Sequence, residues 1–270
     1  FPVSLQTGIL NVSEDATITN ISHEGESRVN VFSGKVLTIT EDLNVGSNKT
    51  MEVNGTGGKI KLNNSLILSG SLLMADEITL EGGTLSFDGG IVSVKEDSII
   101  SSSISHEGSS TFEISSGKTA TLQTDFIVPE SKKMSLTGSN GILNLENTIT
   151  LSGTIEFNSD YTVDNGTISL NGGALLVKED VTTSSSFIHN LDSTINISTG
   201  KTMTHSGGDL NVGAKTLSFV GGGNFININN LVLDDPEAIL KLDGIASLKN
   251  VSVPVVLTTG KIDVDQDSVL

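Results

Sequence analysis

The 270-residue chain is predicted to form a parallel β-solenoid, a stack of coils built from short strands, on the basis of three observations. Blocks of sequence recur about every 83 residues, and inside each block pairs of apolar residues recur every six or seven residues. The composition suits short strands joined by tight corners, with 29 Gly, 4 Pro, no Trp and no Cys. We therefore expect an all-β parallel β-helix with three short strands in each coil, wound in the right-handed sense.

The long repeat is clearest in an acidic segment that occurs four times. Residues 8–15 reappear as 90–97, 173–180 and 260–267, so the final Asp recurs at spacings of 82, 83 and 87 residues. The same step relates the Gly-Lys dipeptides at Gly34, Gly117 and Gly200, and the histidines His23, His106 and His189. We expect one continuous solenoid over residues 1–270, with repeats at about 8–89, 90–172 and 173–259 and the start of a fourth at 260–270. The longer last interval predicts an irregular loop between Leu240 and Gly260, where Pro254 lies.

The short period defines the strands. In the two best-preserved stretches the apolar pairs are Ile60/Leu62, Leu66/Leu68, Leu72/Met74, Ile78/Leu80, Leu85/Phe87 and Val92/Val94, then Leu143/Leu145, Ile149/Leu151, Ile155/Phe157, Tyr161/Val163, Ile168/Leu170 and Leu175/Val177. Each pair has the period of two that is typical of a strand with one buried face. Three such strands make a coil of roughly 18 to 21 residues, so one long repeat corresponds to about four coils. A tandem array of β-sandwich domains remains the alternative.

Charge and chain ends limit the partners. The chain has 32 Asp and Glu against 15 Lys and Arg, a net charge of −17, so we expect no nucleic-acid partner and no attraction to an anionic membrane surface. No apolar run approaches the roughly 20 residues of a membrane helix, so this segment is not expected to insert. The chain starts without Met and its repeat runs to the last residue, so we expect flanking repeats of the same polypeptide and uncapped ends that stack end to end.

Three groups of residues are candidates for chemistry. His23, His106 and His189 lie about four coils apart, roughly 19 Å, which is too far for one metal, and we expect them at corners on the solvent side. The acidic pairs Glu14-Asp15, Glu96-Asp97 and Glu179-Asp180, with Asp265 and Asp267, offer oxygen ligands for calcium, but no calcium nonapeptide or EF-hand loop is present. Carboxylate groups that a glycosidase would need are Asp160 with Asp164, Asp76 with Glu77 and Glu81, and Asp234 with Asp235 and Glu237.

None of these groups is convincing as a site. Clusters of acids arise by chance in so acidic a chain, and aromatic platforms for sugars are few. We therefore assign no catalytic, cofactor-binding or metal-binding residue, and expect no cofactor and at most weak surface binding of Ca²⁺. The chain is expected not to be an enzyme.

The Gly-Lys-Thr corner at Gly117-Lys118-Thr119, the short aliphatic pairs, the lack of Cys and the acidity resemble the β-helical shafts of bacterial surface adhesins of the filamentous-haemagglutinin-like and autotransporter-passenger type. This resemblance implies an extracellular, cell-surface location and a structural or adhesive role, as a rigid rod for attachment or display. Its partner would be a host cell, a neighbouring cell or a glycan. The alternative function is a polysaccharide-binding or polysaccharide-cleaving β-helix, a lyase, a hydrolase or a tailspike-like protein.

Overall fold

The computed structural model describes residues 2–23, 25–245, 247–250 and 256–265, and its regular elements there are all β-strands. None of these residues forms a helix with the length and hydrophobicity needed to cross a membrane. The chain divides into two compact units, which we describe separately. Unit 1 contains Phe1–Phe126 and Thr137–Glu146, and unit 2 contains Ile127–Leu136 and Asn147–Leu270.

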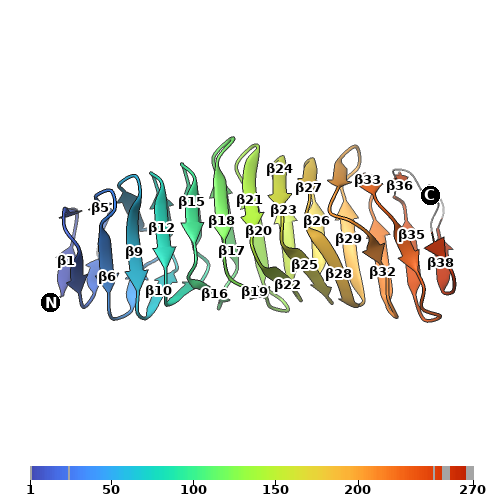
Figure 1. Ribbon diagram of the computed structural model, residues 1–270, viewed down its shortest axis with the longest axis horizontal. Coiled ribbons are helices and arrows are strands. Elements are labelled where there is room, and N and C mark those ends of the chain that lie inside the picture. The colour runs from blue at the N-terminus through green and yellow to red at the C-terminus, as the bar shows by residue number, and fades with distance from the viewer. Residues whose placement is uncertain (1, 24, 246, 251–255, 266–270) are drawn as a thin grey trace. The chain divides into compact units, whose positions relative to one another are not determined.

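Unit 1 contains three parallel sheets, called A, B and C, which the chain visits in turn (Figure 1). Sheet A contains β1 (Val3–Leu5), β4 (Ile21–His23), β7 (Leu43–Val45), β10 (Ser65–Leu68), β13 (Thr84–Phe87) and β16 (Ser103–His106). Sheet B contains β2 (Ile9–Val12), β5 (Ser27–Val31), β8 (Thr50–Asn54), β11 (Ser71–Met74), β14 (Ile91–Val94) and β17 (Ser110–Ile114). Sheet C contains β3 (Ala16–Ile18), β6 (Val36–Ile39), β9 (Gly58–Leu62), β12 (Ile78–Glu81), β15 (Ser98–Ile100), β18 (Thr119–Leu122) and β21 (Gly141–Leu145).

Unit 2 continues the same rotation among sheets. The strands β19 (Phe126–Val128) and β20 (Lys133–Thr137) contribute residues to both units. Sheet A of unit 2 contains β22 (Thr148–Leu151), β25 (Thr167–Asn171) and β28 (Ser186–Leu191), and sheet B contains β23 (Thr154–Phe157), β26 (Ala174–Val177), β29 (Ser193–Ile197), β32 (Thr216–Val220), β35 (Ile239–Asp243) and β38 (Lys261–Val264). Sheet C contains β24 (Tyr161–Asp164), β27 (Val181–Thr183), β30 (Thr202–His205), β33 (Asn224–Ile228) and β36 (Ser247–Asn250). A fourth sheet, D, contains β31 (Leu210–Asn211), β34 (Leu231–Leu233) and β37 (Val256–Leu257).

The strand register confirms the predicted parallel β-helix with three strands in each coil. In sheet C of unit 1, β6, β9, β12 and β15 lie side by side and pair in parallel (Figure 1). The coil length varies more than predicted, since Val3 pairs with Ile21, 18 residues later, while Ser27 pairs with Met51, 24 residues later. The longer coils lengthen strands and corners without changing the alternation of buried and exposed residues. Residues 251–255, inside the predicted irregular loop, lie outside the described part of the chain, as does Asp267.

The core of each unit is filled by the predicted apolar pairs. All twelve pairs identified in the sequence are buried, from Ile60/Leu62 to Leu175/Val177. Register places each inward residue over its counterpart in the next coil, as with Leu66, Leu85 and Ile104. These aliphatic stacks bury apolar area continuously along the coils, which is the main stabilising contribution that a narrow interior can offer.

Corners explain the repeated glycine. Gly34, Gly117 and Gly200 have φ angles of 71°, 69° and 76°, and a Cβ added at any of them meets nothing within 4 Å. Glycine is therefore favoured there by backbone conformation and not by lack of space. The lysine that follows each glycine has a partner in the preceding coil, described below.

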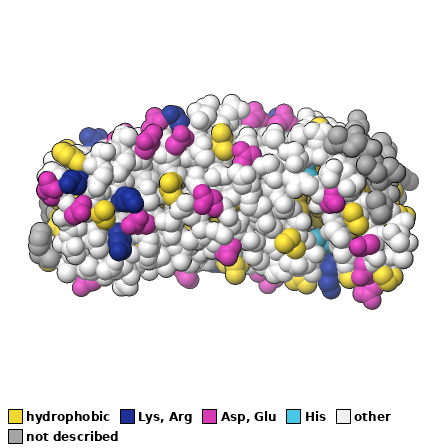
Figure 2. Space-filling model, viewed as in Figure 1, with side chains coloured by type: hydrophobic (Ala, Val, Ile, Leu, Met, Phe, Trp, Pro, Cys, Tyr) yellow, Lys and Arg dark blue, Asp and Glu magenta, His cyan; other side chains and the backbone are white. Residues whose placement is uncertain are grey.

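Charge is distributed unequally among the sheets. No strand of sheet A in either unit contains Asp, Glu, Lys or Arg, whereas strands of sheet B carry charges of both signs, such as Arg28, Glu52, Glu113 and Glu156. In the view of Figure 2, acidic side chains are scattered among uncharged ones, and hydrophobic side chains appear as isolated spots. The surface charge therefore lies mainly on corners and on two of the three sides.

Candidate functional site

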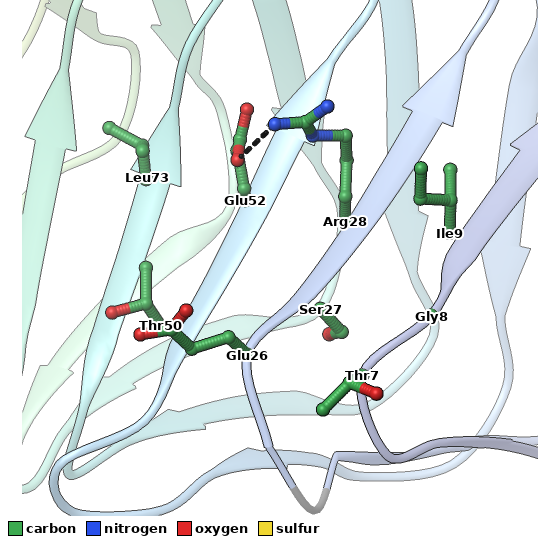
Figure 3. Close-up of a pocket in the computed structure, with 9 residues that line it drawn as sticks. All are labelled: Thr7, Gly8, Ile9, Glu26, Ser27, Arg28, Thr50, Glu52 and Leu73. Atoms are coloured by element: carbon green, nitrogen blue, oxygen red, sulfur yellow. Dashed lines mark hydrogen bonds and ion pairs between the residues drawn. The ribbon is translucent and has the colours of Figure 1, made fainter.

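One described cavity is an open groove on the outer face of sheet B in unit 1, which we call the Arg28 groove (Figure 3). Its volume is about 480 Å³, and it is lined by Thr7, Gly8, Ile9, Glu26, Ser27, Arg28, Thr50, Glu52 and Leu73. Cavities of this size are in the range of small-molecule sites. None of its lining residues was proposed as a site residue from the sequence.

Parallel register builds the floor of the groove. Ile9 pairs with Arg28, Arg28 with Glu52, and Glu52 with Leu73, so four consecutive coils place one outward side chain each in a single row. Figure 3 shows these four side chains side by side, with Arg28 and Glu52 pointing toward each other between the apolar ones. Neighbouring strands are about 4.8 Å apart, so the row extends over about 14 Å.

The ion pair in this row is well defined. Nη2 of Arg28 donates to Oε2 of Glu52 at 2.9 Å, and Nδ2 of Asn54 donates to Oε1 at 2.9 Å. Burial acts to raise the pKa of Glu52, but the hydrogen bonds from Arg28 and Asn54 outweigh it and the pKa lies below its ordinary value. Glu52 is therefore held as a carboxylate, suited to accepting hydrogen bonds and unsuited to acting as a general acid near neutral pH.

A row of amides borders the groove. Nδ2 of Asn30 donates to Oδ1 of Asn11 at 2.7 Å, and Nδ2 of Asn54 also lies 3.3 Å from Oδ1 of Asn30. On the other side, Figure 3 shows the Glu26 carboxylate beside Thr50, away from the Arg28–Glu52 pair. Glu52 is thus engaged by Arg28 and Asn54, whereas Glu26 lies on the Thr50 side of the groove.

A second concavity, of about 340 Å³, lies in unit 2 near the end of sheet A. It is lined by Phe187, Ile188, His189, Asn211, Gly213, Asp234 and Asp235. The strand β28 forms a bulge against β25, and the next strand that contacts it is the short β31 of sheet D. Of the predicted group Asp234, Asp235 and Glu237, the first two line this concavity, and Oδ1 of Asp235 accepts the backbone N–H of Glu237 at 2.8 Å.

The repeated acidic pairs have a structural task, which we call the corner clamp. In each, the Asp accepts a backbone N–H from the next coil: Val36 to Asp15 at 3.0 Å, Thr119 to Asp97 at 2.8 Å and Thr202 to Asp180 at 2.8 Å. The preceding Glu forms an ion pair with the Lys of the Gly-Lys corner: Glu14 with Lys35, Glu96 with Lys118 and Glu179 with Lys201. These ion pairs raise the pKa of each lysine. Both acids of each clamp thus have partners within the protein.

Four of the other predicted carboxylates, Asp76, Asp160, Asp164 and Glu81, also have partners. Asp76 accepts the backbone N–H of Gly55, and Asp160 accepts that of Asp180. Asp164 accepts the hydroxyl of Ser184, and Glu81 lies 3.5 Å from Lys59. Asp160 lies just before the short strand β24 and Asp164 ends it, and their partners Asp180 and Ser184 flank the strand β27 of the next coil. Within the described residues, no three His, Asp or Glu side chains form a group that could hold a metal ion.

The prediction that the three repeated histidines face solvent is wrong. His23, His106 and His189 occupy inward positions of β4, β16 and β28 and are buried. Nε2 of His23 donates to the Thr50 carbonyl at 3.2 Å, Nδ1 of His189 donates to the Val212 carbonyl at 2.5 Å, and His106 stacks between Phe87 and Phe126. Burial lowers the pKa of His23. An imidazole fills an inward position when a carbonyl or hydroxyl is within reach.

No protein-family model, curated protein or solved structure matches this chain. The functional argument therefore depends on the residues of the two units themselves.

Proposed function

We propose that this chain is a structural and adhesive segment of a larger exported repeat protein, which acts at the cell surface as a spacer for attachment or display, without catalysis or a cofactor. The observation that supports this proposal most strongly is the corner clamp. It recurs every four coils, and in each of the three copies the repeated residues make contacts between neighbouring coils. The three copies do not come together in one site. Repetition of stabilising contacts is expected where length and stiffness are the selected properties.

The polysaccharide-related alternative is favoured by a different observation, the Arg28 groove. Its polar lining on an outer sheet face suits recognition of a sugar chain. Binding is better supported than cleavage, because cleavage of a glycosidic bond requires a carboxylic acid with a raised pKa. The pKa of Glu52 is lowered.

Length variants test the spacer role. Deleting residues 90–172, or inserting a second copy of them, joins equivalent positions of the repeat and changes the chain by about four coils. We expect the maximum dimension in small-angle X-ray scattering to change by about 19 Å in each direction, at about 4.8 Å per coil. When the variants are displayed on cells with an epitope at the distal end, the epitope height should follow the same order. Independence of both quantities from the copy number would refute the spacer proposal.

A further inference from the structure

The Arg28 groove differs from the equivalent places in the other repeats. The step of 83 residues places Thr111 and Thr194 at the position of Arg28, and Ser135 and Ser218 at the position of Glu52. Arg28 is also the only arginine in the sequence. The strands confirm the equivalence, since β5, β17 and β29 each begin with Ser followed by the compared residue. A charged pair has therefore replaced two small hydroxyl side chains in one repeat alone.

Ser27 lies beside the groove but faces the core. It pairs in register with the buried residue Met51, the residue is 6% exposed, and its hydroxyl is buried. Its equivalents Ser110 and Ser193 are buried as well, and Ser110 Oγ lies 2.9 Å from Nε2 of the buried His106. The side chains that a ligand in the groove can reach are therefore the outward ones of the row, Ile9, Arg28, Glu52 and Leu73.

We propose that the Arg28 groove binds an uncharged oligosaccharide, with Arg28 and Glu52 as its polar contacts. The guanidinium donates hydrogen bonds and the Glu52 carboxylate accepts them. Ile9 and Leu73 at the ends of the row offer apolar contact for the C–H faces of sugar rings. Together these groups match a ligand that is dense in hydroxyls and has apolar faces.

Charge and shape select the ligand class. The lining contains one arginine against Glu26 and Glu52, and the whole chain has a net charge of −17, so an acidic sugar would be repelled. The row of four outward side chains extends over about 14 Å along an open face, which suits an internal segment of a chain better than an enclosed small molecule. This inference deepens the proposed function, because it identifies what the adhesive segment would attach to.

The test uses the isolated chain on a glycan array that carries neutral tetrasaccharides of glucose, mannose and galactose beside tetragalacturonate. The double variant Arg28→Thr/Glu52→Ser installs the residues found in the other repeats, so its fold should be retained, as circular dichroism will verify. A matched control is Lys95→Thr/Glu113→Ser, which removes an exposed ion pair of the same sheet outside the groove.

We expect at least one neutral tetrasaccharide to bind, the groove variant to lose tenfold or more in affinity, and the control variant to bind within twofold of the unmodified chain. The inference is overturned if the chain binds no neutral tetrasaccharide, if tetragalacturonate binds as tightly, or if both double variants bind equally. Failure of binding would leave the spacer prediction intact, since copy number and epitope height do not depend on the groove.

Discussion

The outer face of sheet B in unit 2 contains a buried carboxylate whose removal should have a measurable, pH-dependent cost. Glu156 on β23 is paired with Lys133 at 2.7 Å and with Lys178, and its side chain is 7% exposed. Hydrogen bonds from Lys133 and Lys178 outweigh burial and lower the pKa of Glu156 from 4.5 to about 2. The substitution Glu156→Gln retains the shape of the side chain and removes its charge.

The magnitude follows from the shift in pKa. Each pKa unit corresponds to about 1.4 kcal/mol, so a shift from 4.5 to about 2 sets an upper limit of roughly 3.5 kcal/mol on the contribution of the ionised group. The side chains of Lys133 and Lys178 are 47% and 51% exposed, and solvent screening reduces this value. We expect Glu156→Gln to lower the free energy of unfolding by about 2 kcal/mol at pH 7.

The pH dependence is fixed by the direction of the shift. A carboxyl group whose folded-state pKa is depressed contributes its full stability above the unfolded pKa, and this contribution is lost as the pH falls from about 4.5 to about 2. The deficit of Glu156→Gln should therefore shrink to less than half at pH 3.

Urea unfolding of both chains at pH 7, 4.5 and 3, followed by circular dichroism, measures this deficit. Glu113→Gln is the matched control on the same kind of sheet face, because among the described residues Glu113 has one lysine partner, Lys95, beside the Ser93 hydroxyl, and its side chain is 41% exposed. Its deficit at pH 7 should be about 0.5 kcal/mol. A Glu156→Gln deficit that is the same at pH 3 and pH 7, or that equals the control, would refute the reasoning.

Three further substitutions test the core, the corner clamp and the buried imidazoles. Phe112→Ala empties a fully buried position and should cost about 3 to 5 kcal/mol in urea unfolding, whereas a cost below 1 kcal/mol would mean that this core is loosely packed. Asp97→Ala removes the acceptor of the Thr119 N–H and should cost about 1 kcal/mol, with faster hydrogen exchange at Thr119 and unchanged exchange at Thr202. Burial lowers the pKa of His205, so the stabilising contribution of the neutral imidazole is complete above pH 6.5 and is lost as the pH falls below that value. Between pH 7 and pH 5.5 the free energy of unfolding should therefore fall less for His205→Phe than for the unmodified chain.

The core was predictable because the alternation of apolar residues repeats in every strand. Each pair such as Leu143/Leu145 has a period of two and a fixed distance to the next corner, so the buried side and the coil follow from local spacing alone. Coil length was predicted less well, because strand pairs of five residues such as β5 and β8 extend a coil beyond three short strands. Those extra residues lie at corners and strand ends, where periodicity carries no information.

The histidines were misplaced for a reason that the sequence itself contains. His23, His106 and His189 each follow an apolar residue by two positions, Ile21, Ile104 and Phe187, which is the spacing of a buried pair. Because histidine is usually classed as a polar residue, these three pairs do not stand out as apolar pairs in the sequence. The Arg28 groove could not be predicted in the same way, because Arg28 and Glu52 are 24 residues apart and become neighbours only through the register of a lengthened coil.

The distribution of charge explains how so acidic a chain can stack in parallel coils. Equivalent outward positions in adjacent coils lie about 4.8 Å apart, so a row of like charges would be destabilising. The strands of sheet A avoid the problem because they carry no Asp, Glu, Lys or Arg. In sheet B each described acid is paired with a cation, either in a neighbouring coil, as in Arg28–Glu52, or on its own strand, as in Lys241–Asp243. The remaining described acids lie at corners or at the ends of strands, where residues such as Asp97 accept backbone N–H groups, and the N–H dipoles compensate the negative charge. A net charge of −17 is therefore compatible with this fold only if acids are excluded from unpaired rows. The substitution Lys95→Glu would place a second acid beside Glu113. It should lower the free energy of unfolding more than Lys95→Thr does in the same urea assay.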